Sequence, residues 1–441
     1  MEKKAIFRRE ENEKLKKRIK ELTESRDSWK EKYKSKKNMA QSSSIFEGKK
    51  AARHHYSIAL TNLVIELYKY GGMSLRSCRH CLSCLFICLG MQTKAPSHSS
   101  IRNWLCKCGI YRVKMRPASS DGQVIFVDES ITFGSEKILL ILGVCEHKIK
   151  AKKALTHEDM SVLYVSAGKE WKGERIKEEI EKIAQREKVK YVVSDQGTNL
   201  RKAYKLLNYS HIEDCTHILA KYLKAIYEKD EDFEAFRKLI GKLRQSWNLS
   251  KDKSQYMPPT MRGKMRFANI FPCVSWAKKM LHDWDKLSEE VQLKLSFIKE
   301  NSDFITSLFE VEKIFKFVCA KLKNEGFGLS QKQEILEMFS EGTWGERSSI
   351  FVENCKDYLT NLTQKSKFLG EEHLLCSSDI IESYFGKFKA KVNPNSRSGL
   401  TEFIFTIATF GQSFSQEEVK KAMQNIKIKD LKLYKKKAKA A

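Results

Sequence analysis

Val124-Ile125-Phe126-Val127-Asp128 is a run of β-branched and aromatic residues that ends on an acid. Tyr191-Val192-Val193-Ser194-Asp195 repeats that arrangement 67 residues later (195 − 128). Short apolar runs of this composition predict buried strands. Each aspartate would then stand where a strand reaches the surface, and the two carboxylates would be adjacent if the strands are neighbours. The alternative is that each Asp only begins a turn, as Asp often does after a strand.

Three further strands and two helices are expected around these runs. The strand candidates are residues 138–144, 162–166 and 211–213, and the helix candidates are residues 171–187 and 199–207. Three strands followed by alternating helix and strand is the order of an RNase H-like fold. The predicted fold class is therefore an α/β RNase H-like core, a mixed five-stranded sheet with helices.

The chain has 441 residues, which is too long for one ordinary core. Residues 228–370 lack the alternation of strand and helix, and their apolar residues, such as Phe233, Phe236 and Ile240, recur at helical spacing. We interpret this region as an all-helical insertion. The predicted domains are a coiled coil with linker (1–50), a helix-turn-helix domain (51–116), the first part of the core (120–227), the insertion (228–370), the second part of the core (371–415) and a basic tail (416–441).

The charge of the chain favours a polyanionic partner. Lys and Arg number 82 against 55 Asp and Glu, a formal net charge of +27. That excess concentrates polyphosphate around a protein, although a basic surface can also serve solubility alone. Residues 1–20 are charged throughout and offer no secretory signal, and no run of 18 apolar residues exists. We expect no membrane association, reduced cysteines and a cytoplasmic, nucleoid-associated protein of bacterial type.

The two ends of the chain carry separate signals. Leu15, Ile19, Leu22, Trp29 and Tyr33 fall on alternating steps of three and four, with one step missing, which predicts a short coiled coil over residues 5–33. A lone solvated helix is the alternative. The lysines between residues 427 and 439 form a basic tail that can contact phosphates without any fold.

Residues 56–70, 74–89 and 97–108 are three helical stretches separated by glycine-containing turns. This spacing is typical of a helix-turn-helix module, whose last helix lies in the DNA major groove. The polar residues of that helix, and hence the candidates for DNA contact, are His98, Ser99, Arg102 and Asn103. A plain three-helix packing unit explains the pattern nearly as well.

Cys78-x2-Cys81-x2-Cys84-x3-Cys88 has the spacing of an iron–sulfur cluster run. No proline follows Cys88, however, and the leucines between the cysteines describe an apolar helix in which Cys is a small filler. A zinc site that joins Cys78 and Cys81 to Cys106 and Cys108 is the remaining alternative.

At three places the sequence resembles the DDE transposases, which have an RNase H-like core, here with an all-helical insertion as in bacterial insertion-sequence types. Val127-Asp128-Glu129-Ser130 is similar to the first acidic strand end of that family, and Ser194-Asp195-Gln196-Gly197 to the second. Ser377-Ser378-Asp379-Ile380-Ile381-Glu382 is similar to the late helix that carries the third acid. The interval from Asp195 to Glu382 is 187 residues (382 − 195), which the insertion accounts for.

Asp214-Cys215-Thr216-His217 resembles the Cys/Asp-x-x-His element of hAT, Mutator-like and related bacterial transposases. At this spacing Asp214 and His217 share a helix face, so that His217 could orient a phosphate or a carboxylate while Asp214 fixes its tautomer. A helix N-cap Asp with an incidental His is the alternative.

The resemblance implies that Asp128, Asp195 and Glu382 bind two Mg²⁺ or Mn²⁺ ions. Carboxylates that converge on two cations about 4 Å apart can activate the attacking oxygen and stabilise the leaving one. Asp379 lies on the same helix face as Glu382, and the family pattern leaves it as a cap or a supporting residue. Three lysines farther along that helix could contact phosphates or simply be solvated: Lys387, Lys389 and Lys391.

The function expected from these features is that of a DNA transposase acting at the ends of its own mobile element. Its partners would be double-stranded DNA, both terminal inverted repeats and target, with a homodimer or higher multimer on the paired ends. An RNase H-like nuclease or resolvase would need neither the insertion nor the helix-turn-helix. A transposase-derived DNA-binding regulator would not need the three acids Asp128, Asp195 and Glu382.

Overall fold

The computed structural model describes residues 16, 18–31, 48–91, 93–133, 136–248, 255–261, 267–392 and 401–431. The chain divides into two compact units. One contains the segment up to Lys114 together with Ser413–Lys435, and the other contains Met115–Gln412.

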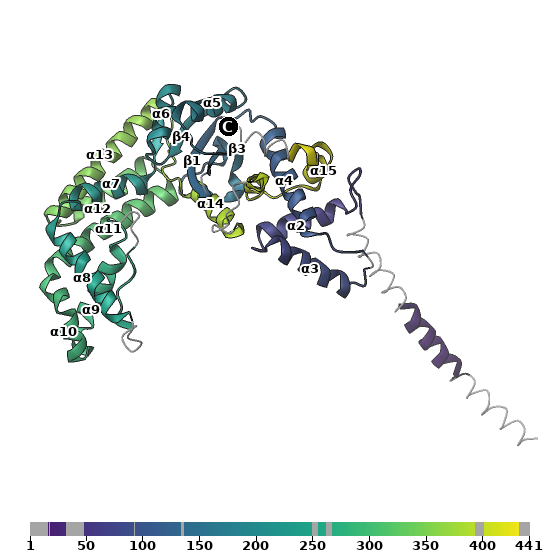
Figure 1. The fold of residues 1–441 in the computed structure, drawn as a ribbon, viewed down its shortest axis with the longest axis horizontal. Helices are drawn as coiled ribbons and strands as arrows, with labels where there is room; N and C mark the ends of the chain where they lie inside the picture. Colours follow the sequence, from purple (N-terminus) through teal and green to yellow (C-terminus); the bar gives the residue numbers. More distant parts are fainter. Residues whose placement is uncertain are drawn as a thin grey trace, which may run out of the picture. The chain divides into compact units, whose positions relative to one another are not determined.

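The larger unit is built on a five-stranded sheet with strand order β3-β2-β1-β4-β5 (Figure 1). Strands β1, β2 and β3 pair antiparallel, and β4 and β5 extend the sheet in parallel from β1. This confirms the mixed sheet and all five predicted strands. Their bounds are β1 Gln123–Phe133, β2 Glu136–Cys145, β3 Ser161–Gly168, β4 Val189–Ser194 and β5 His211–Glu213.

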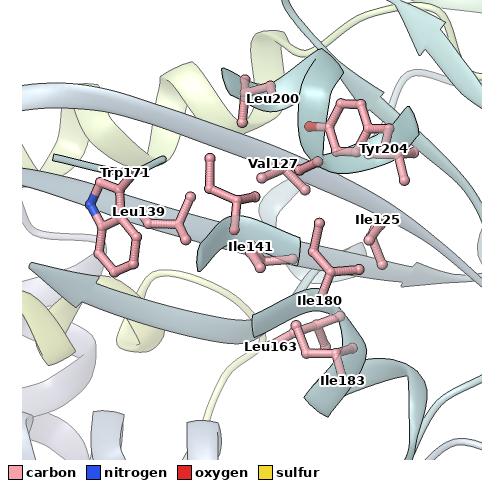
Figure 2. Packing of buried hydrophobic residues seen from close by; sticks show 13 residues of the cluster. Ile125, Val127, Leu139, Ile141, Leu163, Trp171, Ile180, Ile183, Leu200 and Tyr204 are labelled. Atoms are coloured by element: carbon pink, nitrogen blue, oxygen red, sulfur yellow. The ribbon is translucent and has the colours of Figure 1, made fainter. Parts of the chain in front are cut away.

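Alternation along the central strands sends side chains to two covered faces. Ile125 and Val127 of β1 and Val192 of β4 belong to one buried apolar cluster, in which helices α5 (Gly173–Ala184) and α6 (Thr198–Leu207) cover the sheet. Figure 2 shows Ile180 of α5 and Tyr204 of α6 over these strands. Because side chains alternate, Val124 and Phe126 point to the opposite face, where helix α14 (Asp379–Lys391) packs against β1.

Between β5 and α14 the described residues form helices, with one isolated bridge between Phe327 and Leu374 as the only extended pairing among them. Phe233 and Phe236 are buried there, as their spacing predicted. The helices are α7 Cys215–Tyr227, α8 Glu231–Trp247, α9 Phe271–His282, α10 Glu289–Glu300, α11 Ser302–Glu325, α12 Leu329–Glu341 and α13 Glu346–Leu369.

The smaller unit is helical. The three predicted helices are present as α2 (Ile58–Lys69), α3 (Leu75–Cys88) and α4 (His98–Met115). Helix α4 runs seven residues beyond the predicted end at residue 108 (115 − 108) and stops two residues before Pro117, a residue that cannot continue a helix. Its middle is buried on several sides, including Cys106 and Cys108.

The segment predicted as a basic tail from residue 416 begins with a helix. Gln416–Asn425 forms helix α15, which packs against α2. Ser415 and Glu418 form a capping box at its start. Arg112 of α4 donates to the Ser413 carbonyl at 2.9 Å, and Lys107 donates to the Met423 carbonyl at 3.3 Å. The charged residues dominate the sequence of this segment and concealed the apolar residues that α15 buries, Val419, Ala422 and Met423.

Near the N-terminus residue 16 and residues 18–31 are helical, and Ile19, Leu22 and Trp29 are 63%, 58% and 69% exposed. The rest of the predicted coiled coil, including Leu15 and Tyr33, lies outside the described residues. All twelve cysteines are free thiols. No helix in the described part of the chain is both long and apolar enough to cross a lipid bilayer.

Candidate active site

Asp128 and Asp195 are brought together by the pairing of β1 with β4. These strands run parallel with Phe126 opposite Val193. Asp128 lies two residues farther along β1, and Asp195 directly follows the last residue of β4, so the register places the two aspartates at the ends of neighbouring strands. Adjacent strands lie about 4.8 Å apart. Alternation from Phe126 sends the Asp128 side chain toward the face covered by α14. Both residues are half-buried and can therefore reach solvent.

The pairing of β1 with β2 is irregular directly after Asp128. Asp128 pairs with Leu140 and Ile131 with Ile138, so two residues of β1 stand against one of β2. Such bulges re-aim side chains and are frequent beside active sites. One of these two β1 residues is Glu129, a half-buried carboxylate.

Glu129 is the acid that sequence reasoning missed. Its Oε2 lies 3.6 Å from Lys137 Nζ, and it shares a hydrogen bond with the Asn199 side chain. Burial raises the pKa of Glu129, and the charge of Asp195 raises it further, while Lys137 lowers it. A strand pattern alone could not indicate that its carboxylate lies near Asp195, because alternation assigns Glu129 and Asp128 to opposite faces.

Asp195 also organises the turn that follows β4. Its Oδ1 accepts a hydrogen bond from the Gly197 backbone N–H at 2.8 Å, directly before helix α6. A Cβ at Gly197 would lie 3.0 Å from the same oxygen, which is tighter than nearly all real contacts. The glycine after the second acid therefore gives the carboxylate room in this turn.

His217 stands one turn into α7, and the predicted pairing with Asp214 is present. The Asp214 side chain accepts from the His217 backbone N–H and from Nδ1, both at 3.0 Å. The hydrogen bond donated to Asp214 raises the pKa of His217 to about 9, and the charges of Asp195 and Glu382 contribute to that rise. With this raised pKa His217 is a cation at neutral pH, and the charges of two predicted catalytic acids favour that form.

Glu382 lies in the first turn of α14, with its side chain accessible to solvent. Surrounding protein raises the pKa of its carboxyl through desolvation, and the positive charge of His217 opposes that rise. Asp379 is the first residue of the helix and not its cap, because Ser378 occupies the N-cap position. The Asp379 carboxylate is paired with Lys323 at the end of α11.

The donor set suits a hard divalent cation, because carboxylate oxygens are the ligands that Mg²⁺ and Mn²⁺ prefer. Asp128 and Asp195 would offer such oxygens from neighbouring strand ends, and Glu382 would offer a third from α14. No three His, Cys, Asp or Glu residues in the described part of the chain stand close enough together to hold an ion. The three acids therefore fit a divalent cation by their chemistry, although their side chains do not form a cluster.

The chain is similar in structure to the Drosophila P element transposase strand transfer complex. The TM-score is 0.45 at 14% sequence identity, and the match covers 83% of this chain and 94% of that chain. No protein-family model and no curated protein matches the sequence. At this level of similarity no residue of the present chain takes its role from that complex.

The predicted DNA-contact residues lie at the start of α4. His98 and Ser99 are exposed, and Arg102 and Asn103 are half-buried. Helix α3 presents a second basic surface that the sequence analysis did not single out. Its exposed cationic residues are Arg76 and Arg79, beside the exposed His80, and the helix contains no acid. Only Cys78, Leu82 and Phe86 of α3 are buried, one residue per turn.

The three lysines of α14 lie in its second half. Lys389 is exposed, and Lys387 and Lys391 are half-buried. The zinc alternative receives no support, because Cys106 and Cys108 are buried in the core of the helical unit and no cluster of metal ligands exists among the described residues.

Proposed function

We propose that this chain is a DNA transposase that cleaves and joins strands at the ends of its own mobile element. In this proposal the sheet is the core of an RNase H-like domain, and helices α8 to α13 are an insertion within it. The observation that carries the proposal is that Asp128 and Asp195 follow neighbouring parallel strands, while helix α14, whose first turn contains Glu382, packs against the first of these strands. His217, which the Asp214 carboxylate keeps cationic, begins the helix that follows β5.

Asp128, Asp195 and Glu382 would hold two divalent ions, Mg²⁺ or Mn²⁺. When bound, such ions polarise the scissile phosphate and activate an attacking oxygen. The successive nucleophiles would be water and then a 3′ hydroxyl, with no covalent protein intermediate. Exposure of the side chains at the sheet edge supports access for a DNA strand.

His217 would contact the scissile phosphate or a carboxylate that binds metal. Its Nδ1 is engaged by Asp214, so Nε2 is the nitrogen that remains to donate to a phosphate oxygen. The raised pKa keeps the ring protonated at neutral pH. A charged donor beside a phosphate makes a stronger hydrogen bond than a neutral one.

Recognition of double-stranded DNA is assigned to the helical unit and the basic residues of α14. The net charge of +27 supports a polyanionic partner, and the exposed cationic residues of α3 and α4 offer contacts with phosphates and base edges. Self-association is assigned to the N-terminal helix, whose exposed Ile19, Leu22 and Trp29 have the spacing of a coiled-coil seam.

The test is metal-dependent cleavage of a labelled fragment from the end of the element, which inverted repeats flanking the gene identify. The intact chain should nick this fragment with Mg²⁺ or Mn²⁺ and not with EDTA. It should then join the freed 3′ end to a target duplex. A chain that binds the fragment but never cuts it under any divalent metal would support the regulator alternative and overturn the proposal.

A further inference from the structure

Asp214 is a buried carboxylate, 1% exposed, whose two oxygens serve two different helices. Its Oδ1 accepts from the His217 backbone N–H and from His217 Nδ1, both at 3.0 Å, at the start of α7. Its Oδ2 accepts from the Ser378 backbone N–H at 2.7 Å and from Ser378 Oγ at 3.1 Å. Ser378 is the N-cap residue of α14, the helix that carries Glu382.

Other contacts fasten the same segment before α14. The Cys215 backbone N–H donates to the Cys376 carbonyl at 2.8 Å, and the Leu375 backbone N–H donates to Tyr191 Oη at 3.0 Å. Those bonds connect the segment to α7 and to β4. Among the described side chains it is the Asp214 carboxylate that accepts from the N-cap residue itself, which lies 164 positions later in the sequence.

The chemistry of the four bonds requires an acceptor-only group. Every partner is a donor: two backbone N–H groups, a hydroxyl and a ring N–H. A carboxylate can accept all of them, whereas an amide of the same shape has only one oxygen and would direct an NH₂ group at donors on one side. The partners also lower the pKa of Asp214 despite its burial, so the charged form persists at neutral pH.

Glu382 depends on this arrangement through the first turn of its helix. The Glu382 backbone N–H donates to the Ser378 carbonyl at 3.4 Å, so the residue held by Asp214 also begins the turn that presents Glu382. On the other side, the same carboxylate accepts from Nδ1 of His217 and so fixes the orientation of that ring. One buried group thus joins the third acid and the histidine.

We propose that Asp214 is a positioning residue that fixes the Glu382 helix and the His217 ring relative to the two strand-end aspartates. An effect of Asp214 on the rate of cleavage rests on the proposed function. Its effect on the structure at the start of α14 does not. Loss of the carboxylate should loosen the start of α14 before it affects the rest of the larger unit.

The experiment compares Asp214→Asn with Asp230→Asn in the full chain. Asp230 is a matched control, because it caps α8 by accepting from the Phe233 backbone N–H at 2.8 Å and also pairs with Arg347, far from the acids in sequence. Hydrogen exchange of the backbone amides of residues 379–385 is measured without DNA or metal. Asp214→Asn should accelerate exchange there, and Asp230→Asn should leave it at the wild-type rate.

Equal exchange at residues 379–385 in Asp214→Asn and wild type, or equal acceleration in both variants, would overturn the proposal. Ser378→Ala keeps the experiment decisive if Asp214→Asn does not fold, because it removes only the Oγ bond and should accelerate exchange at the same amides to a smaller degree. If Asp214→Asn does not fold and the folded Ser378→Ala exchanges the amides of residues 379–385 at the wild-type rate, the proposal is wrong.

Cleavage assays separate the inference from the proposed function. If the wild type cleaves terminal DNA, Asp214→Asn should lower kcat by about 10- to 100-fold, as losses of supporting hydrogen bonds around metal ligands do, with unchanged DNA affinity. Asp230→Asn should cleave normally. If the wild type does not cleave but the exchange result holds, the proposed function fails and the positioning role stands.

Discussion

Lys323 Nζ lies 2.6 Å from Asp379 Oδ2, and this pairing separates two acids that the sequence places three residues apart on one helix. The carboxylate of Asp379 is engaged by a cation from α11, whereas the positive charge of His217 lowers the pKa of Glu382 against the effect of burial. The spacing could not show which of the two is the third acid of the proposed site. The ion pair of Asp379 favours Glu382 for that role.

Glu382→Gln should therefore abolish strand cleavage, while Asp379→Asn should retain most of it. Asn at position 379 keeps the size of the side chain and loses a partly exposed ion pair, which contributes about 1 kcal/mol or less. The measurement is the single-turnover rate of nicking for both variants. Near-normal cleavage by Glu382→Gln together with an inactive Asp379→Asn would reverse the assignment.

Asp128→Asn and Asp195→Asn should each lose cleavage by about 1,000-fold or more while DNA binding persists. The carboxylates supply charge to ions whose contribution is several kcal/mol, and about 4 kcal/mol corresponds to a thousandfold rate. Recognition relies on basic groups elsewhere. Rates and Kd are measured on the same fragment. Glu129→Gln is the informative comparison, because it removes a neighbouring acid outside the predicted triad. This variant should still cleave the fragment.

Stability of the larger unit should fall as pH drops from about 6.5 toward 4. Burial lowers the pKa of His211 to about 4, and its Nε2 lies 2.9 Å from Ser194 Oγ. The unfolded chain, with an ordinary histidine pKa of about 6.5, takes up the proton first, so acid favours unfolding across this interval. The shift corresponds to about 3 kcal/mol.

Urea unfolding of wild type and His211→Gln at pH 7 and pH 4.5 checks this expectation. The stability of the variant should depend less on pH than that of the wild type, because glutamine cannot titrate. Parallel pH dependence in the two proteins would show that other groups cause the acid sensitivity.

Arg76→Ala and Arg79→Ala together should weaken DNA binding and lower its salt dependence. Each lost phosphate contact reduces the slope of log K against log salt by about 0.9. The control is Asn103→Ala in α4, which removes no charge and should leave the slope unchanged while altering sequence preference if α4 contacts bases. Binding isotherms between 50 and 200 mM salt provide the comparison. An unchanged slope in the arginine variant would assign the phosphates to other residues.

Removal of residues 413–441 should destabilise the helical unit. Helix α15 contributes buried Val419, Ala422 and Met423, and loss of a buried aliphatic side chain typically costs 2–5 kcal/mol. Restoring residues 413–431 alone should recover stability, because Val419, Ala422 and Met423 all lie within them. Circular dichroism melts of the three chains measure the difference.

The strands were predictable because buried β-branched runs leave a strong local signal. The runs before Asp128 and Asp195 indicated both the strands and the acids at their ends. Glu129 and Ser378 were not predictable, since their roles arise from a bulge and from a contact 164 residues away. Helix α15 was missed because its lysines and glutamates outnumber the few apolar residues that it buries.

Helix α15 packs against α2 and accepts a hydrogen bond from Lys107 of α4, and these contacts make the order of synthesis important. A ribosome releases residues 48–115 first, yet Met423, the partner of Lys107, and Ser413, the partner of Arg112, emerge only after Asp128, Asp195 and Glu382 have been made. The contacts of the helical unit are therefore completed last, although its first helices are made first. A polypeptide that terminates before Ser413 would contain Asp128 and Asp195 without a finished helical unit, and under the proposed function such a product would compete poorly for the ends of the element.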